Sequence, residues 1–234
     1  MTGGDAHGSD LPSGAEKTRT VRLMFDRIAD RYDLVNRVMT LGLDVGWRRR
    51  AVRELRLPGA SLVADLACGT GDLCTELLRA GYRTVGFDFS HGMLTTATTA
   101  APLVESDVLQ LPLPDASMDG ATCGFALRNV TDLADLFAET ARIVRPGGRA
   151  AFLEAGEPEG GPLRAGHALY FKRIVPVIGG ALSDREAYRY LPASMAYLPA
   201  PARLVQMLGE AGFERVERIQ LTAGAAQLLL GTRR

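Results

Sequence analysis

The sequence predicts an α/β fold in which helices cover both faces of a doubly wound, mostly parallel sheet of about seven strands. Three observations predict it. Beyond the N-terminal region, short apolar runs alternate with amphipathic stretches of helical period, which is typical of parallel βαβ units. The run at 61–66 leads through Gly69-x-Gly71 into a helical stretch, so a glycine turn joins a strand to a helix. The chain ends in two strand-like runs, 213–220 and 225–231, which would close the sheet as a hairpin.

The N-terminal part is predicted to be a tail followed by helices. Residues 1–16 are interpreted as a disordered tail, because the segment is rich in Gly, Asp and Ser and has no apolar core of a secretion signal. Residues 17–57 are expected to form two or three helices. Apolar side chains repeat there at helical spacing, at Val21, Phe25, Ile28, Ala29 and Tyr32.

The rest of the chain is predicted to form the sheet and one insertion. Within 61–155, a cofactor-binding core, we expect strands at 61–66, 83–88, 103–106, 118–126 and 149–155, and helices at 72–80, 91–100 and 131–144. Residues 156–200 are rich in Gly, Pro and Tyr and break this rhythm, which indicates a substrate-covering insertion with helices near 163–178 and 184–190. Residues 201–234 would add a helix at 201–211 and the hairpin. Because no linker separates two cores, we expect a single domain over 17–234.

Composition and charge exclude several classes of function. The 234 residues carry 27 basic and 27 acidic side chains, so the formal net charge is zero, and only 6% of the residues are aromatic. Neither feature favours nucleic-acid binding. The three cysteines have no paired spacing, which argues against a disulfide framework and a zinc site and favours a cytoplasmic location. No apolar run approaches the roughly 18 residues of a membrane span.

The glycine turn predicts a site for a nucleoside cofactor. Gly69 and Gly71 would let a ligand approach the backbone closely, and Asp88, at the end of the next strand, could hold ribose hydroxyls. Where a dinucleotide-binding turn has its third glycine, this chain has Cys74.

Acidic side chains around the turn distinguish between two cofactors. Asp65 in the strand and Asp72 at the helix start would repel a pyrophosphate, whereas they suit the positive amine and sulfonium of S-adenosylmethionine. We therefore predict S-adenosylmethionine rather than the cofactor of an NAD(P)-dependent oxidoreductase. The alternative is that both are merely a strand acid and a helix N-terminal charge. After the third strand, Asp107 and the backbone N–H of Val108 could read the adenine edge, or Asp107 is a solvated turn residue.

Two longer motifs resemble signatures of a known family. Residues 24–33 (Met-Phe-Asp-Arg-Ile-Ala-Asp-Arg-Tyr-Asp), with 36–37 and 47–48, resemble the N-terminal signature of the UbiE/MenG/Coq5 family of quinone-biosynthesis C-methyltransferases. Residues 125–132 (Phe-Ala-Leu-Arg-Asn-Val-Thr-Asp) resemble its second signature, and the resemblance covers about 20–232. It implies a class I S-adenosylmethionine-dependent methyltransferase that acts on a ring carbon of a lipophilic, prenylated quinol, with demethylmenaquinol as the expected acceptor.

The resemblance also implies cofactor contacts. Thr70, Asp88, Asp107 and Val108 match positions that contact the cofactor in the family. The family has a serine just before the second signature, where this chain has Gly124, so one hydroxyl is missing from that contact.

Arg128 and Asn129 are the predicted catalytic residues, because they follow the C-terminal end of a central strand, where open α/β sheets bind ligands. Arginine stays protonated, so Arg128 would stabilise a phenolate rather than act as the base. The resemblance implies that a water, oriented by Asn129 and Tyr32, removes the proton. The alternative is that Arg128 forms a structural pair with a carboxylate and shapes the loop.

The insertion supplies the predicted substrate contacts. Tyr170, Tyr188 and Tyr190 would line an apolar tunnel for a prenyl tail, and His167 could contact the ring. Core packing is the alternative for the tyrosines.

The basic run after Trp47 suggests a surface contact. Arg48, Arg49, Arg50 and Arg53 could approach an anionic membrane surface, or they form a solvated helix face. The expected location is therefore cytoplasmic, with peripheral contact at the inner face of the cell membrane, and a homodimer remains open.

Two other functions remain as alternatives. One is a C-methyltransferase of a phenolic or quinoid natural product in secondary metabolism, and the other is a catalytically silent S-adenosylmethionine-binding subunit. Residues 153–156 (Leu-Glu-Ala-Gly) stand where Leu-Glu-Phe-Ser is usual in the family, and Leu229 replaces a usual histidine. These departures lie on the substrate side, so they bear on the acceptor more than on the reaction.

Overall fold

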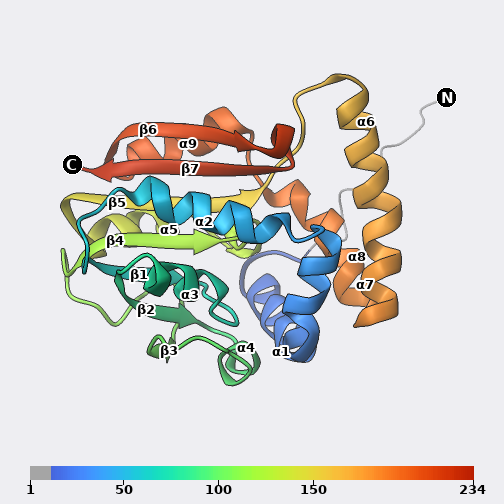
Figure 1. Cartoon of the computed structure of the whole chain (residues 1–234), viewed down its shortest axis with the longest axis horizontal. Coiled ribbons are helices and arrows are strands. Elements are labelled where there is room, and N and C mark those ends of the chain that lie inside the picture. The colour runs from blue at the N-terminus through green and yellow to red at the C-terminus, as the bar shows by residue number, and fades with distance from the viewer. Residues whose placement is uncertain (1–11) are drawn as a thin grey trace.

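The computed structural model describes residues 12–234, apart from some side chains between 163 and 191. One sheet of seven strands runs through the molecule in the order β3-β2-β1-β4-β5-β7-β6 (Figure 1). Its strands are β1 Leu62–Leu66, β2 Arg83–Asp88, β3 Leu103–Glu105, β4 Met118–Gly124, β5 Val144–Ala155, β6 Phe213–Leu221 and β7 Ala226–Arg233. The strands β1 to β5 are parallel, whereas β7 is antiparallel to both β5 and β6. The predicted sheet and its closing hairpin are confirmed.

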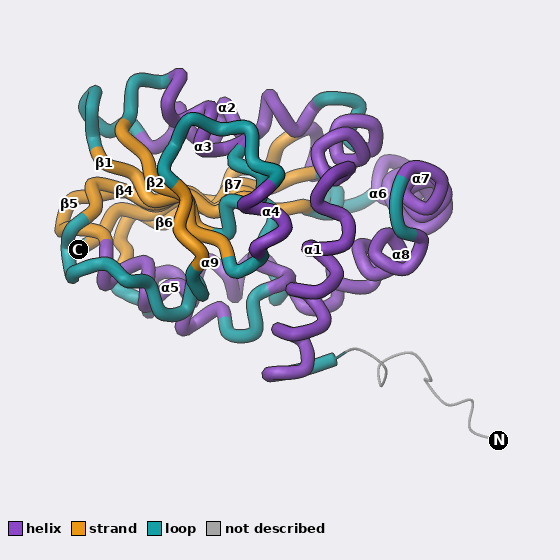
Figure 2. The backbone as a smooth tube through the Cα atoms, turned by 90° about the horizontal axis from the view of Figure 1, so that it is seen from below, coloured by secondary structure: helices purple, strands orange, loops and turns teal. Residues whose placement is uncertain are grey.

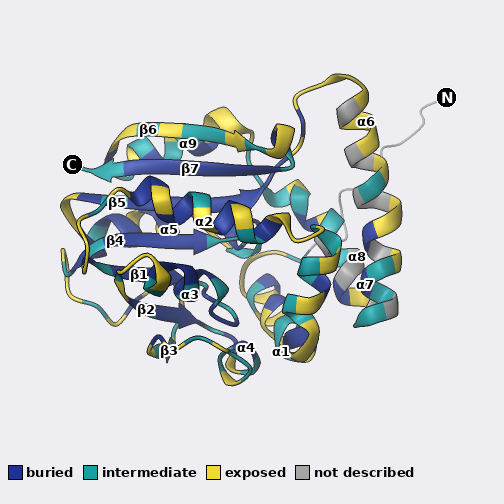
Figure 3. Ribbon diagram, viewed as in Figure 1, coloured by how far each residue is buried: buried dark blue, intermediate teal, exposed yellow. Residues whose placement is uncertain are grey.

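Helices cover both faces of this sheet. α2 (Leu43–Leu55) and α3 (Asp72–Arg79) pack on one face, and α5 (Leu133–Ile143) and α9 (Pro201–Glu210) on the other (Figure 1, Figure 2). Successive residues of β1 point to opposite faces, so Val63 joins the core under α2 and α3 while Ala64 joins the core under α5 and α9. Figure 3 shows the central strands almost wholly buried. Burial on both faces explains why these strands are near-continuous apolar runs in the sequence.

The remaining helices gather at the carboxyl edge of the parallel strands. α1 (Gly14–Met39) packs against α4 (His91–Thr95) at this edge. α6 (Gly161–Leu169), α7 (Val175–Leu182) and α8 (Arg185–Ser194) lie beyond it, with α7 and α8 in contact with α1 (Figure 1). The segment interpreted as an insertion therefore lies beside the strand ends. No helix within residues 12–234 is both long and apolar enough to cross a membrane.

Helix α1 begins earlier than expected. It starts at Gly14, so residues 14–16, assigned to the tail, are helical. An anchor in the first turn explains this: Lys17 Nζ donates to the carbonyl oxygen of Val130 at 2.8 Å and lies 3.8 Å from the centre of the Tyr197 ring. Residues 1–11 of the predicted tail lie outside the described part of the chain.

The helix expected at 91–100 is shorter, because α4 ends at Thr95. Threonines dominate the following residues, and their β-branched side chains lower helix propensity. In addition, the N–H of Thr98 donates to the carbonyl oxygen of Thr70 at 3.2 Å. This bond directs the backbone to the glycine turn instead of continuing the helix.

Candidate active site

Three cavities meet at the carboxyl edge of the sheet. The edge cavity, of about 720 Å³, lies between the strand ends and α1; the apolar cavity, of about 1080 Å³, lies between α1, α2 and α7; the turn cavity, of about 360 Å³, lies over the glycine turn. Tyr32 and Phe125 border all three. The other lining residues include Gly69, Asp88, Asp107 and Val108 for the edge cavity, Asn36, Leu41, Leu43 and Arg128 for the apolar cavity, and Arg48, Asp65, Thr70 and Asp72 for the turn cavity.

The glycine turn depends on backbone that only glycine adopts readily. Gly69 has φ +57° and Gly71 has φ +84°. A Cβ atom at Gly71 would lie 2.4 Å from Thr99 Cγ2, so there is also no room for one. A Cβ at Gly69 would meet nothing within 4 Å, because this residue faces the edge and turn cavities. A ligand can therefore approach the backbone at Gly69, as the sequence predicted.

Asp88 ties the turn to the next strand. Its Oδ2 accepts a hydrogen bond from the Gly69 N–H at 2.8 Å, and its Oδ1 accepts one from the Ser90 N–H at 2.8 Å. Burial raises the pKa of Asp88 to about 6. Each oxygen keeps acceptor capacity and the residue borders the edge cavity, so contact with ribose hydroxyls is compatible with this arrangement.

Asp107 and Val108 also border the edge cavity. The Oδ1 of Asp107 accepts from the N–H of Leu109 at 2.9 Å, which is the turn contact that the sequence left as the alternative. The same residue still faces the cavity, so the turn contact and an adenine contact do not exclude each other. Gly124 borders both the edge and turn cavities, and a Cβ there would only touch Leu73 Cδ2, at 3.4 Å.

Asp65 lies at the base of the turn cavity and is fully buried. Thr122 Oγ1 donates to its Oδ1 at 2.7 Å, and the thiol of Cys74 donates to its Oδ2 at 3.2 Å. Burial raises the pKa of Asp65 to about 6, against the opposing effect of these hydrogen bonds. Cys74, which replaces the third glycine of a dinucleotide-binding turn, thus supports the acid that distinguishes this site.

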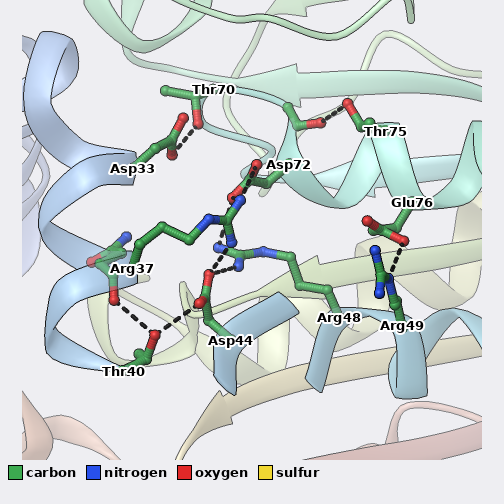
Figure 4. Close-up of polar contacts among 12 residues, drawn as sticks. Asp33, Arg37, Thr40, Asp44, Arg48, Arg49, Thr70, Asp72, Thr75 and Glu76 are labelled. Carbon is green, nitrogen blue, oxygen red and sulfur yellow. Dashed lines mark hydrogen bonds and ion pairs between the residues drawn. The ribbon is translucent and has the colours of Figure 1, made fainter. Parts of the chain in front are cut away.

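Asp72, in contrast, is engaged in ion pairs. Its carboxylate oxygens both lie 3.1 Å from Arg37 Nη2, and its Oδ2 lies 3.3 Å from Arg48 Nη2 (Figure 4). Arginines of α1 and α2 therefore offset its charge, and its effect on the positive groups of the cofactor stays a prediction. The hydroxyl of Thr70 donates to Asp33 Oδ1 at 2.7 Å, so a second contact links α1 to the turn.

Arg128 forms a buried ion pair with Glu154 at the end of β5. The Nη1 group of Arg128 contacts Glu154 Oε1, and the backbone N–H of Arg128 donates to Oε2 at 3.2 Å. The structural pair that the sequence left as an alternative is thus present. However, Arg128 also borders the apolar cavity, and its Nε is buried. The Nε–H of Arg128 has no acceptor among the described residues.

Asn129 and Tyr32 lie on the cofactor side of Arg128. The Oδ1 of Asn129 is likewise buried without a partner in the described part of the chain, and Asn129 borders the edge cavity. Burial raises the pKa of Tyr32, although the guanidinium of Arg128 and a hydrogen bond with Asn36 act in the opposite direction. The Tyr32 hydroxyl is thus protonated and can donate a hydrogen bond at the place where the cavities meet.

The substrate residues predicted in the insertion differ in where the structure places them. Tyr170 borders the apolar cavity, and its hydroxyl donates to the Met39 carbonyl oxygen at 2.6 Å. Tyr190 packs on the core of α1, α4 and α8 instead, as the core-packing alternative has it, and burial raises its pKa to about 12. The side chains of His167 and Tyr188 lie outside the described residues.

The basic run on α2 differs from the expected surface patch. Trp47 and Arg48 are buried, and Arg48 pairs with Asp44 and Asp72. Two further arginines also form ion pairs: Arg49 with Glu76 at 3.1 Å and Arg50 with Glu54 at 2.7 Å. Acids on α2 and on the neighbouring α3 lie opposite these arginines, so most of the positive charge is offset locally.

Comparison with known proteins identifies the family. A model described as the ubiE/COQ5 methyltransferase family matches residues 13–233. The chain belongs to this family. A protein named demethylmenaquinone methyltransferase from Roseiflexus castenholzii is 42% identical over 96% of this chain and 98% of its own length. One of the same name from Deinococcus radiodurans is 42% identical over 94% and 95%, and the C-methyltransferase UbiE of Syntrophotalea carbinolica is 40% identical over 91% and 93%.

Solved structures share the fold of the ubiE/COQ5 chain. A possible histamine N-methyltransferase from Thermotoga maritima has a TM-score of 0.65 and 19% identity over 92% of this chain and 100% of its own. Phosphoethanolamine N-methyltransferase 2 from Haemonchus contortus, in complex with S-adenosyl-L-methionine, has a TM-score of 0.68 and 13% identity over 91% and 60%. The predicted class I fold is confirmed, and the chain is an S-adenosylmethionine-dependent methyltransferase.

The residues at the edge and turn cavities fit this cofactor. Gly69 leaves open space for a close approach, Asp88 presents acceptors for ribose hydroxyls, and Asp65 presents a buried carboxylate for an ammonium group. Two buried carboxylates, Asp65 and Asp88, lie beside the turn, which suits a sulfonium and disfavours a pyrophosphate.

Three residues at or beside the cavities were not predicted as site residues from the sequence. Phe125 was noted only as part of a signature, yet it borders all three cavities. Glu154 was noted only as part of an unusual segment, yet it holds Arg128. Arg48 was assigned to the surface, although its spacing of four residues from Asp44 is a signal for an ion pair on a helix.

Proposed function

We propose that the protein transfers the methyl group of S-adenosylmethionine to a ring carbon of a prenylated quinol, with demethylmenaquinol as acceptor and menaquinol as product. The observation that carries the proposal is the apolar cavity, which adjoins the two cofactor cavities at Tyr32 and Phe125. Its walls include Met39, Leu43 and Trp47, which suit an apolar ring and tail. The relatives named demethylmenaquinone methyltransferase support the same acceptor.

In this proposal, Arg128 activates the acceptor. A ring carbon becomes nucleophilic when the neighbouring hydroxyl loses its proton and its charge spreads onto the ring. The unpartnered Nε–H of Arg128 would donate to the phenolate oxygen, and a charge-assisted hydrogen bond is strong in such a buried position. Glu154 holds the guanidinium from the opposite side. When bound, S-adenosylmethionine supplies a methyl group already activated on a sulfonium.

Asn129 and Tyr32 would handle the proton. A water that donates to the unpartnered Oδ1 of Asn129 and accepts from the Tyr32 hydroxyl could take the hydroxyl proton of the quinol and pass it to solvent. After the methyl group is transferred, the hydrogen on the methylated carbon leaves as a second proton and the quinol oxygen is reprotonated, so the ring becomes aromatic again with a net release of one proton. Both residues border the edge cavity, and Tyr32 also borders the apolar cavity. Phe125 would separate the ring from the turn cavity and hold it in place, and such positioning can lower the barrier by as much as ~7–11 kcal/mol.

We further propose that the rim of the apolar cavity contacts a lipid surface, where a prenylated quinol is dissolved. Leu41 and Leu43 border the cavity and are 81% and 44% exposed. Leu34 and Val38, four residues apart on α1, are exposed as well. These four residues are the apolar rim. A lipid surface covering it would place the cavity mouth where the acceptor partitions.

A second candidate acceptor is a phenolic or quinoid natural product. Ala155 borders the apolar cavity at a position where the family pattern has Phe, and Ala225 borders it too. Small side chains at both places leave room for a ring with bulkier substituents.

A panel of reduced acceptors tests the two candidates. The protein is incubated with S-adenosylmethionine and demethylmenaquinols of several prenyl lengths, demethylated benzoquinols and unprenylated phenols, and the ring mass is measured. We expect demethylmenaquinol to gain one methyl group. Methylation of unprenylated phenols alone would favour the second candidate, and a panel without any methylated ring would contradict both.

A further inference from the structure

Arg48 is the one cation among the described residues that border the turn cavity. Its side chain is only 7% exposed, and its guanidinium carbon lies 5.5 Å from the centre of the Phe125 ring. The residue also borders the apolar cavity. Its charge therefore lies at the junction of the cofactor and acceptor cavities.

The amino-acid end of S-adenosylmethionine carries an ammonium and a carboxylate on one carbon. Asp65, at the base of the turn cavity, can receive the ammonium. Among the described residues, the charged side chains that border this cavity are Arg48, Asp65 and Asp72. Without the guanidinium of Arg48, a ligand carboxylate would face only the two negative charges. An unpaired carboxylate in a buried site is costly. We infer that Arg48 binds the methionyl carboxylate of S-adenosylmethionine.

The existing ion pairs of Arg48 permit this contact. Its Nη1 pairs with Asp44, whereas its Nη2 lies 3.3 Å from Asp72 Oδ2, a longer contact. Arg37 Nη2 lies 3.1 Å from both oxygens of Asp72, and Figure 4 shows the two guanidinium groups side by side between the two acids. When Nη2 of Arg48 turns to the ligand, Asp72 keeps Arg37 and Asp44 keeps Nη1. No buried charge is then left without a partner.

The placement of Asp65 supports the same assignment. The positive charge of Arg48 lowers the pKa of Asp65, which burial otherwise raises, so the two groups lie within electrostatic reach of each other. The ammonium of the ligand needs a negative partner and its carboxylate needs a positive one, and the two partners must lie close together, as Asp65 and Arg48 do. A guanidinium also offers two N–H groups that match a carboxylate.

A cycle of two proteins and two ligands tests the contact. The dissociation constants of S-adenosylhomocysteine and of its decarboxylated analogue, S-adenosyl-3-thiopropylamine, are measured by calorimetry for the wild type and for Arg48→Met. Both ligands keep the amine, so they differ only in the carboxylate. We expect Arg48→Met to raise the dissociation constant of S-adenosylhomocysteine roughly 10- to 100-fold more than that of the analogue, because the variant loses a charged hydrogen bond to the carboxylate.

Arg49→Met is the matched control. Arg49 is the next residue of α2, but it pairs with Glu76 and does not border the turn cavity, so its loss should shift both ligands by the same factor. Arg48→Lys keeps the charge and both acids satisfied, and it should retain part of the preference for the carboxylate. That variant also answers the question if Arg48→Met fails to fold, because a ligand preference unchanged from the wild type would overturn the inference.

Equal weakening of both ligands in Arg48→Met would also overturn it, since that is the effect of a purely structural role. The inference rests on the cofactor and not on the acceptor of the proposed function. No acceptor is present in the measurement, so failure of every quinol to be methylated would leave this result standing.

Discussion

Arg128 and Glu154 join the loop after β4 to the end of β5 beside the apolar cavity. Glu154 accepts hydrogen bonds from the guanidinium and from the backbone N–H groups of Arg128 and Ala155, the last at 2.7 Å. The carboxylate therefore fixes both the side chain and the backbone of Arg128. The pair neutralises the charges that burial would penalise, and it leaves one N–H of the guanidinium pointing elsewhere.

A single and a double substitution separate the structural role of Arg128 from its proposed catalytic role. Arg128→Met leaves Glu154 buried without its counter-charge, so we expect the free energy of unfolding to fall by about 3–5 kcal/mol. Turnover should be lost as well. The double variant Arg128→Met/Glu154→Gln should recover much of the stability in urea unfolding but none of the turnover. Recovery of turnover in the double variant would show that Arg128 has no catalytic part.

The buried acids predict how cofactor binding depends on pH. Burial raises the pKa of both Asp65 and Asp88 to about 6, whereas an exposed aspartate has a pKa of about 4. Below about pH 6 these groups hold protons that a positively charged ligand must displace. Calorimetry from pH 5 to 8 should show affinity for S-adenosylmethionine rising through pH 6 and then levelling, by up to about tenfold per pH unit for each group. Asp65→Asn should reduce the slope, and a flat wild-type profile would contradict the assignment.

The raised pKa values of Asp65 and Asp88 affect the free energy of unfolding in the opposite direction. Between about pH 4 and pH 6 the folded protein holds protons at Asp65 and Asp88 that the unfolded chain has released. The free energy of unfolding contributed by these groups therefore falls as the pH rises through this window. Ligand binding and stability thus respond in opposite directions to one pair of acids.

Among the elements, α1 has the most direct influence on the site. It lines the edge cavity with Val21 and Phe25, and Tyr32 faces all three cavities. Its N-terminal end is held by the contact of Lys17 with the Val130 carbonyl oxygen, and burial lowers the pKa of Lys17 to about 8. Toward its C-terminal end, the Asp33–Thr70 hydrogen bond and the ion pairs of Arg37 hold it to the glycine turn. The helix therefore forms one wall of the edge cavity and is held at both ends.

Releasing the N-terminal anchor should loosen this wall. Lys17→Met keeps the apolar stem but loses a charged hydrogen bond, which is worth roughly 1.5–3 kcal/mol. We expect faster amide exchange in the first turns of α1 and a dissociation rate of S-adenosylhomocysteine raised about tenfold or more. Arg22→Met is the control on the same helix, because its ion pair with Glu105 is largely exposed and should contribute little. Equal effects of the two substitutions would contradict the anchor.

At the scale of the whole molecule, the parallel strands bring every predicted cofactor residue to one edge. β1, β2 and β4 end beside one another, so Gly69, Asp88 and Gly124 border a common cavity although they are distant in the sequence. The segment α6–α8 then lies beyond α1 at the same edge (Figure 1). Cofactor and acceptor cavities can therefore adjoin without a second domain. Two residues of the apolar rim, Leu41 and Leu43, border the apolar cavity.

The proposed lipid contact can be tested at Leu41, the most exposed residue of the rim. This leucine has φ +53°, a conformation that asparagine tolerates better, so Leu41→Asn should not weaken the fold. We expect the variant to float less than the wild type with anionic phospholipid vesicles and to methylate vesicle-borne acceptor more slowly. Leu23→Gln, at a residue of α1 that is 52% exposed and does not line the cavity, is the control.

Two outcomes would contradict the lipid contact. Equal flotation of the wild type and Leu41→Asn would mean that the rim does not face the vesicle. A concentration-dependent dimer that Leu41→Asn dissociates, measured by sedimentation, would mean that a second copy of the chain covers the rim instead.

Features that depend on residues close together in the chain could be predicted from the sequence. Periodicity predicted the strands, because residues of a buried strand are apolar whatever lies beside them. The glycines and the following acids predicted the cofactor, because a turn with positive φ has local requirements. The motifs at 24–33 and 125–132 predicted the family that the comparisons confirm. The helix at 91–100 was the exception, since a hydrogen bond to the distant Thr70 ended it early.

Which charged side chains form pairs depends on how the elements pack, and this could not be predicted from the sequence. Glu154 lies 26 residues from Arg128 and Thr70 lies 37 residues from Asp33, and no local pattern links such positions. Arg48 belongs to a basic run of the kind that usually lies on a protein surface. Packing of α2 over the sheet nevertheless buries it between Asp44 and Asp72. A charge is placed by the free energy of its burial with partners from other elements, and that is settled when the elements pack. The sequence therefore determined what binds at this edge, and the packing determined which side chains are free to hold it.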